Sequence, residues 1–266
     1  MNLPLKQNKI MAMTTSGNEA CPYYMFVPKI ISENPKILVS VHGITRNAIE
    51  HCTRFAEVFD LKNTILIVPL FTRKRFKHYQ KLRADESGLR PSDALDLILG
   101  DVEDKFGYTS DKFILSGYSG GGQFAHRYAM LYPERIQKLV LMAPGWYTFP
   151  DASKDYPEGT KTKAEFKDLQ FYSKGLLSFP IEVIVGERDV RRDKTLNRTG
   201  TIDQVQGRTR LQRSQSWVEA VRRLAKDNNM IPNIKLAIIS GAGHDFQVNF
   251  SKRAFTDRVR NAVFDL

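Results

Sequence analysis

The chain has 266 residues, 42% hydrophobic and 26% charged, a composition near the globular average that excludes a disordered, collagen-like or coiled-coil chain. No apolar run reaches the roughly 18 residues that cross a bilayer, and the first residues lack a secretory signal, so we expect a cytoplasmic protein without membrane contact. The net charge is +11, and the two cysteines, Cys21 and Cys52, are too few for a disulfide framework and match no paired metal-ligand spacing.

Short apolar runs alternate along the chain with longer segments of helical period. Most runs are continuous in Ile, Val and Leu, as in strands of a parallel sheet whose two faces are both covered by helices. The predicted strands are Tyr23–Val27, Ile37–Val41, Ile65–Val68, Phe113–Ser116, Leu139–Met142, Ile181–Val185 and Ile234–Ile239.

Amphipathic helices are predicted between these strands. The clearest is Pro91–Phe106, where Leu95, Leu99 and Val102 share one face and Gly107 follows the end. The others are Ala48–Asp60, Gln123–Tyr132, Gln212–Asp227 and Ser251–Phe264. This alternation predicts an α/β fold in one domain over residues 1–266, a doubly wound and mostly parallel sheet flanked by helices.

Two connections are longer than usual in such a fold, residues 144–180 and residues 189–213. Both leave the carboxyl end of a predicted strand, where the loops of an open sheet line the ligand crevice. We therefore expect 144–180 to form a short lid insertion, with a lid helix within Lys161–Lys174, and 189–213 to form a basic loop at the pocket. Surface excursions without a role at the pocket are the alternative.

The sequence Gly117-Tyr118-Ser119-Gly120-Gly121 satisfies the pattern G-x-S-x-G. It follows a predicted strand directly and precedes a predicted helix, which is the setting of a nucleophile elbow. Such a tight turn crowds its neighbours and explains the glycines two residues before and after Ser119. A phosphate-binding turn is the alternative, but neither the dinucleotide nor the P-loop pattern is met.

A serine hydroxyl needs an adjacent base, and that base needs a carboxylate to orient it. In the fold of a nucleophile elbow these residues follow in the order Ser, acid, His, each on a loop after a later strand. Asp189 follows the predicted strand that ends at Val185, and His244 follows the one that ends at Ile239. We therefore predict a catalytic triad of Ser119, Asp189 and His244.

Neighbouring acids compete with Asp189 for this role. Glu187 lies nearer the strand end, and Asp193 lies beyond a basic pair, so Asp189 is favoured over both. Asp245 adjoins His244 and is expected to cap the segment that follows rather than to bond its neighbour's ring.

The early segment Val39–Ile44 ends in His-Gly-Ile and supplies a candidate oxyanion hole. In a nucleophile-elbow fold one donor is the N–H after the nucleophile, and the second comes from the loop after an early strand. We predict the backbone N–H groups of Gly120 and Ile44 as these donors, with Thr45 as the reserve for the second. His42 is expected to fix the loop through a ring hydrogen bond.

Together, the segments VSVHG, SGYSGGGQFAHRYAMLYPERIQKLVLMAPGWY, VIVGERD and GAGHD resemble the α/β-hydrolase superfamily over nearly the whole chain. Within it they are similar to polyhydroxybutyrate-depolymerase-like and feruloyl-esterase-like serine hydrolases. The resemblance implies hydrolysis of a small-molecule carboxylic ester through an acyl-serine intermediate, without a cofactor or a metal. The superfamily also contains peptidases and thioesterases, so those reactions of the same triad stay open.

An aromatic cluster after the strand Leu139–Met142 is a candidate substrate pocket. Trp146 and Tyr147 lie in it, and with Tyr118 of the elbow they are the predicted substrate-binding residues. The same cluster could simply be core, because pockets and cores are both mostly apolar.

Two basic segments account for the excess charge. Residues 73–83 carry six Lys or Arg and no acid, and residues 190–213 carry seven Lys or Arg and two acids. Both follow strand ends, so they predict a positive rim that favours an anionic substrate, with merely solvated loops as the alternative. A non-catalytic polyanion-binding protein is the other class of function, but no nucleic-acid motif is present, and we expect no nucleic-acid partner.

Overall fold

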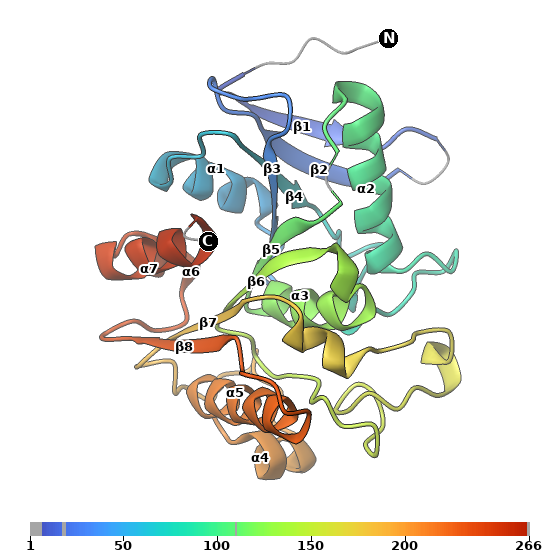
Figure 1. Cartoon of the computed structure of the whole chain (residues 1–266), viewed down its shortest axis with the longest axis vertical. Coiled ribbons are helices and arrows are strands. Elements are labelled where there is room, and N and C mark those ends of the chain that lie inside the picture. The colour runs from blue at the N-terminus through green and yellow to red at the C-terminus, as the bar shows by residue number, and fades with distance from the viewer. Residues whose placement is uncertain (1–6, 18–19, 110, 265–266) are drawn as a thin grey trace.

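The computed structural model describes residues 7–17, 20–109 and 111–264, and its described strands form one eight-stranded sheet in the order β1-β2-β4-β3-β5-β6-β7-β8 (Figure 1). Strands β1 and β2 run antiparallel to their neighbours, and every pairing from β4 to β8 is parallel. The strands are β1 (Ile10–Thr14), β2 (Pro22–Phe26), β3 (Lys36–Val41), β4 (Thr64–Pro69), β5 (Phe113–Tyr118), β6 (Ile136–Met142), β7 (Ile181–Gly186) and β8 (Ile234–Ile239).

Helices cover both faces of this sheet. They are α1 (Ala48–Val58), α2 (Pro91–Phe106), α3 (Gly120–Leu131), α4 (Gly200–Gln206), α5 (Arg210–Asp227), α6 (Phe246–Phe250) and α7 (Arg253–Phe264). In Figure 1, α1, α6 and α7 lie on one side of the strands and α2, α3 and α5 on the other. The predicted doubly wound, mostly parallel α/β fold is confirmed.

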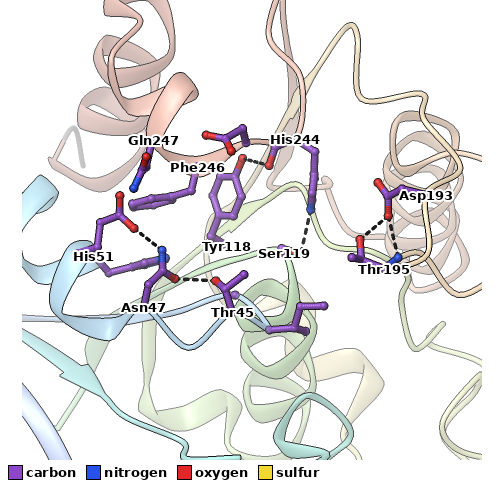
Figure 2. Close-up of a pocket in the computed structure, with 14 residues that line it drawn as sticks. Thr45, Asn47, His51, Tyr118, Ser119, Asp193, Thr195, His244, Phe246 and Gln247 are labelled. Atoms are coloured by element: carbon purple, nitrogen blue, oxygen red, sulfur yellow. Dashed lines mark hydrogen bonds between the residues drawn. The ribbon is translucent and has the colours of Figure 1, made fainter.

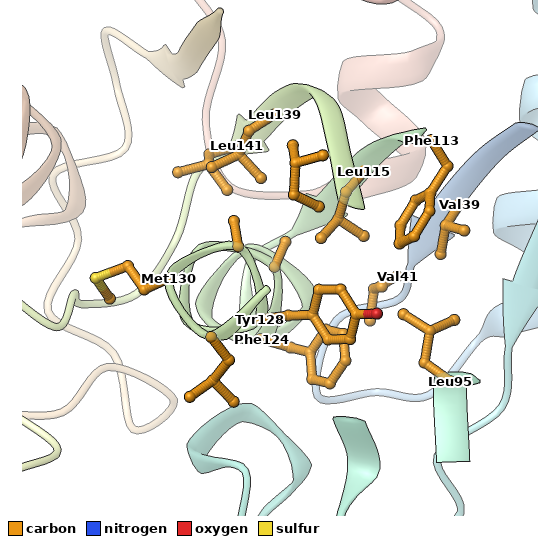
Figure 3. Packing of buried hydrophobic residues seen from close by; sticks show 14 of the residues in the cluster. Val39, Val41, Leu95, Phe113, Leu115, Phe124, Tyr128, Met130, Leu139 and Leu141 are labelled. Atoms are coloured by element: carbon orange, nitrogen blue, oxygen red, sulfur yellow. The ribbon is translucent and has the colours of Figure 1, made fainter. Parts of the chain in front are cut away.

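The core consists of two layers because successive residues of a strand point to opposite faces. In β5, Phe113 and Leu115 join the cluster that packs under α2, α3 and α5, whereas Ile114 joins the cluster under α1, α6 and α7. Figure 3 shows the first layer around α3, where Phe124 and Tyr128 of the helix lie against Val39, Val41 and Leu115 of the sheet. The continuous Ile/Val/Leu runs therefore serve two cores at once.

Local signals in the sequence place the helix ends. Pro91 is the first residue of α2, the Asp93 side chain accepts a hydrogen bond from the Arg90 N–H, and Gly107 ends the helix with a left-handed φ of 70°. In α6 the Asp245 side chain accepts from the Val248 N–H at 2.9 Å, so its predicted capping role is confirmed.

Several elements were not predicted or were predicted wrongly. Strand β1 and the short helices α4 and α6 have no counterpart among the predicted elements. The lid helix within Lys161–Lys174 is wrong, because the segment contains no α-helix, only the 3₁₀ turn Ala164–Phe166 and the start of a second, Ser173–Leu177. Side chains there are tied to distant residues instead, with Glu165 paired to Arg83 and Asp168 to Arg90.

Both cysteines are free and buried. No described helix is long and apolar enough to cross a membrane.

Candidate active site

Ser119 occupies the turn between β5 and α3 in a strained conformation. Its φ of 52° and ψ of −110° are unusual for a residue with a side chain, and its N–H donates to the Met142 carbonyl at 2.8 Å. The turn is tight enough that a Cβ on Gly117 would overlap the backbone of Gly121, and one on Gly121 would overlap the Val41 carbonyl. The glycines thus let α3 approach the sheet and hold the serine at the strand end.

The structure brings the side chains of Ser119, His244 and Asp189 into contact in series. His244 Nδ1 lies 2.7 Å from Asp189 Oδ2, and His244 Nε2 lies 3.0 Å from Ser119 Oγ (Figure 2 shows the second contact). Because the carboxylate accepts a hydrogen bond from Nδ1–H, Nε2 carries no proton and can accept one from the serine hydroxyl. The Asp189 side chain is fully buried, whereas that of His244 is a quarter exposed and lines a pocket.

The competing acids Glu187 and Asp193 hydrogen-bond other groups. Glu187 accepts from the Ser240 hydroxyl and the Gly241 N–H at the surface. Asp193 accepts from the N–H and the hydroxyl of Thr195 and faces the pocket. Neither contacts His244 in the described structure.

The Ile44 N–H is oriented by its neighbours. The Gly43 carbonyl, on the same peptide, accepts from His42 Nδ1 at 2.8 Å and from the Arg46 N–H at 3.0 Å. Because a trans peptide directs its C=O and N–H to opposite sides, the Ile44 N–H points away from His42. No described group accepts a hydrogen bond from it or from the Gly120 N–H, and a Cβ on Gly120 would lie 3.2 Å from the Ile44 nitrogen. The Ile44 nitrogen thus lies close to Gly120.

His42 itself is held in one tautomer. The Phe71 N–H donates to Nε2 at 3.1 Å, so Nδ1 carries the proton that is donated to Gly43. Burial lowers the pKa of His42 to about 4 and keeps the ring neutral. This geometry agrees with the predicted loop-fixing hydrogen bond.

Tyr118 supports the loop that carries His244. Its hydroxyl donates to the His244 carbonyl at 2.9 Å and accepts from the Asn249 side chain at 2.9 Å. Asn249 also donates to the Gly243 carbonyl. Tyr118 lines the pocket, and its hydroxyl bonds the loop, so the side chain holds the histidine loop in place.

An open pocket of about 520 Å³ lies in front of Ser119 (Figure 2). It is bordered by the loop after β3, by α1, by the 189–213 loop and by the loop into α6. The lining residues are Gly43, Ile44, Thr45, Asn47, Glu50, His51, Tyr118, Ser119, Asp193, Thr195, His244, Asp245, Phe246 and Gln247.

The two long connections differ in their relation to this pocket. The 189–213 loop contributes Asp193 and Thr195, whereas no residue of 144–180 is among the lining residues. Trp146 and Tyr147 are therefore not brought to it. Tyr147 stacks on Trp217 with ring centroids 4.9 Å apart, and the Arg127 guanidinium lies 4.4 Å from the Trp146 ring centroid. Both side chains are buried, so the core alternative describes them better than the predicted substrate pocket.

The basic segments do not supply the pocket with positive charge. The carboxylates that line it are Glu50, Asp193 and Asp245, and no described Lys or Arg is among the lining residues. Many of the cations are engaged elsewhere in ion pairs, such as Arg75 with Asp85 and Arg192 with Asp203. The positive rim stays a prediction, because charge counted along a loop does not show which way its side chains point.

Two residues at the site were missed by sequence reasoning. Arg210 contacts Asp189 from α5, and Asn249 holds the histidine loop from α6. Arg210 meets an acid 21 residues away, and Asn249 bonds Gly243 nearby and Tyr118, 131 residues away, so no local motif marks either residue. Within the described residues, no group of three or more His, Cys, Asp or Glu side chains is arranged to hold a metal ion.

The fold resembles that of known proteins. Residues 93–177, which include Ser119, match the family described as alpha/beta hydrolase fold. No curated protein matches the chain in sequence.

Similar solved structures include poly(aspartic acid) hydrolase-1 from Sphingomonas sp. KT-1, with 22% identity, coverage of 97% of this chain and 100% of that one, and a TM-score of 0.81. The poly(3-hydroxybutyrate) depolymerase from Bordetella parapertussis has 21% identity, coverage of 97% and 90%, and a TM-score of 0.79. A ferulic acid esterase has 14% identity, coverage of 96% and 95%, and a TM-score of 0.58. The resemblance predicted from the motifs is thereby confirmed at the level of the fold, and the chain is an α/β-hydrolase-fold protein.

Proposed function

We propose that the protein is a serine hydrolase that cleaves a carboxylic ester through an acyl-serine intermediate. The observation that carries the proposal is the series of contacts from Asp189 through His244 to Ser119, with the serine at a strained strand-to-helix turn. A serine hydroxyl is a weak nucleophile by itself, and this arrangement is the one that activates it.

The reaction follows from the positions of these groups. Ser119 Oγ attacks the ester carbonyl carbon while His244 Nε2 takes the hydroxyl proton, and Asp189 stabilises the imidazolium that forms. The oxyanion of the tetrahedral intermediate accepts from the Gly120 and Ile44 N–H groups, each worth about 3 to 4 kcal/mol in the transition state. Collapse of the intermediate breaks the ester C–O bond, and His244 returns the proton to the departing alcohol.

The second half of the cycle releases the acid. A water molecule gives a proton to His244 and attacks the acyl-serine carbonyl, and the same two N–H groups hold the oxyanion. The bond to Ser119 Oγ then breaks, and the serine recovers its proton from His244. No other group is needed for this chemistry.

An ester is favoured as the substrate by the similar structures. A depolymerase of poly(3-hydroxybutyrate) and a ferulic acid esterase share the fold, and both names denote cleavage of ester bonds. Poly(aspartic acid), the substrate named for another similar structure, is a polyanion joined by amide bonds. The carboxylates that line the present pocket make such a polyanion a poor fit.

The test is labelling by a fluorophosphonate, a reagent that phosphonylates activated serines. We expect the wild type to be labelled at Ser119, Ser119→Ala to lose labelling, and His244→Ala to be labelled at least about 100-fold more slowly. Failure of the folded wild type to label would contradict the proposal. A panel of matched p-nitrophenyl esters, thioesters and aminoacyl amides then separates esterase from thioesterase and peptidase activity.

A further inference from the structure

Arg210, the first residue of α5, has a buried charge that the triad does not explain. Its side chain is 1% exposed. One nitrogen, Nη1, lies 3.4 Å from Asp189 Oδ1 and 3.4 Å from Asp193 Oδ2, and the other, Nη2, donates to the Thr195 hydroxyl at 2.8 Å. A single guanidinium thus joins the carboxylate behind His244 to two residues that line the pocket.

Asp189 needs a partner of this kind. Its side chain has no exposed surface, and a buried carboxylate is costly unless both oxygens are compensated. His244 occupies Oδ2, and among the described residues Arg210 supplies the one contact to Oδ1. At 3.4 Å that contact acts chiefly through charge, because it is long for a hydrogen bond.

Asp193 completes a charge balance. Although its burial raises the pKa, hydrogen bonds from Thr195 and the charge of Arg210 lower it to about 2, so the side chain is ionised near neutral pH. Asp189, Arg210 and Asp193 then carry a formal charge of −1. The imidazolium that forms during attack brings the total to zero. Without Asp193, Arg210 would cancel the charge of Asp189 and leave the imidazolium uncompensated.

We propose that Arg210 is a positioning residue of the Ser119 reaction that fixes Asp189 against His244, and that Asp193 offsets the charge Arg210 brings to the triad. The inference rests on the proposed hydrolase function. The other carboxylates that line the pocket with His244 are its neighbour Asp245 and Glu50 of α1. His51 of α1 also lines the pocket, but burial lowers its pKa well below the usual value and keeps it uncharged.

Two substitutions give shifts of opposite sign in the pH profile of kcat/KM, measured on a neutral p-nitrophenyl ester. Arg210→Met removes a positive charge near the imidazole, so the acid limb moves to higher pH by about half a unit to one unit. Asp193→Asn removes a negative charge and moves the limb to lower pH by a similar amount. Substitution of a residue that only stabilises the fold would leave the acid limb of the profile at its wild-type position.

The rates complete the test. Arg210→Met is expected to lower kcat about 10- to 100-fold per labelled site, with little change in KM. Arg210→Lys keeps the charge but has one nitrogen in place of the two that contact Asp189 and Thr195. Its acid limb is therefore expected to stay near the wild-type position while kcat recovers only partly.

Arg213 provides the matched control. It is a buried arginine one turn along α5 that bonds the Gly145 carbonyl and Asp203 and makes no contact with Asp189. Arg213→Met is expected to lower stability as Arg210→Met does, yet to leave the acid limb in place and kcat per labelled site within about threefold.

The outcomes are distinguishable. Opposite shifts for Arg210→Met and Asp193→Asn, with none for Arg213→Met, support the inference. An unchanged limb in both variants overturns it, and if Arg210→Met does not fold, the presence or absence of the Asp193→Asn shift decides. Wild type that labels and turns over while these variants show no shift would refute the role of Arg210 but leave the hydrolase proposal intact.

Discussion

The geometry around Ser119 depends on side chains that take no part in the proposed chemistry. Tyr118 precedes the serine in the elbow, and its hydroxyl bonds the carbonyl of His244 and the side chain of Asn249. The nucleophile's neighbour in sequence therefore anchors the loop of the base. One short stretch of chain thus sets the positions of two members of the triad.

Replacement of Tyr118 by phenylalanine removes these two hydrogen bonds and keeps the ring. Each neutral hydrogen bond contributes about 1 kcal/mol, so we expect kcat to fall about tenfold while KM stays within about twofold. Steady-state kinetics check this, with Tyr172→Phe at an exposed position as the control. A kcat equal to that of the wild type would show that the loop holds His244 without Tyr118.

Among the secondary-structure elements, the turn from β5 to α3 is tightly packed against β3. Because a Cβ on Gly121 would overlap the Val41 carbonyl of β3, the first turn of α3 can approach the sheet only with glycine there. The position of Ser119 at the end of β5 is a consequence of this close packing.

Gly121→Ala is expected to lower the free energy of unfolding by about 2 kcal/mol or more, since the backbone must move, and to reduce fluorophosphonate labelling with it. Gly100 is the matched control, because it lies inside α2 with no atom within 4 Å of an added Cβ. Gly100→Ala should raise stability by about 0.5 to 1 kcal/mol. Urea unfolding of both variants checks the contrast, and equal effects would contradict it.

The elements that could be predicted from the sequence are those with a local signal. Strands β3, β5 and β7 were predicted because each is a continuous apolar run bounded by turn residues. The elbow was predicted because its tight turn requires glycines close to the serine in the sequence. Strand β1, Ile10–Thr14, was missed because it lies at the sheet edge, has no buried residue and lacks the continuous Ile/Val/Leu run of the inner strands. Contacts such as that of Arg210 with Asp189 depend on the packing of α5 against a distant loop, which no local pattern encodes.

At the scale of the whole molecule, three histidines are buried and neutral. Burial lowers the pKa of His42 to about 4 and those of His51 and His126 well below the usual 6.5. In the unfolded chain all three bind protons below about pH 6.5, whereas the folded chain does not, so stability is lost as pH falls through this range. Asp193, with a pKa of about 2, contributes a loss only in more acidic solution.

We therefore expect the free energy of unfolding to decrease between pH 6.5 and pH 4.5, by up to about 4 kcal/mol per pH unit where all three histidines titrate in the unfolded state. Urea unfolding at pH 7, 6 and 5 measures this slope. A stability that is constant over the range would show that at least some of these rings are protonated in the folded protein.

The overall charge of +11 does not extend to the pocket, whose lining contains Glu50, Asp193 and Asp245 and no described Lys or Arg. An ester with a negatively charged acyl chain should accordingly have a kcat/KM about 3- to 10-fold below that of its neutral isostere at low salt, and added salt should narrow the gap. A faster reaction of the anionic ester at low salt would restore the role of the basic loops that their composition suggested.

The proposed reaction requires that Ser119 becomes acylated during turnover. The most direct measurement is intact-protein and peptide mass spectrometry of enzyme quenched with acid within the first turnovers of a p-nitrophenyl ester. We expect one acyl group per folded chain, located on the peptide that contains Ser119 and missing from Ser119→Ala. Hydrolysis of the ester with no adduct at this residue, or with equal turnover by Ser119→Ala, would contradict an acyl-serine mechanism at Ser119.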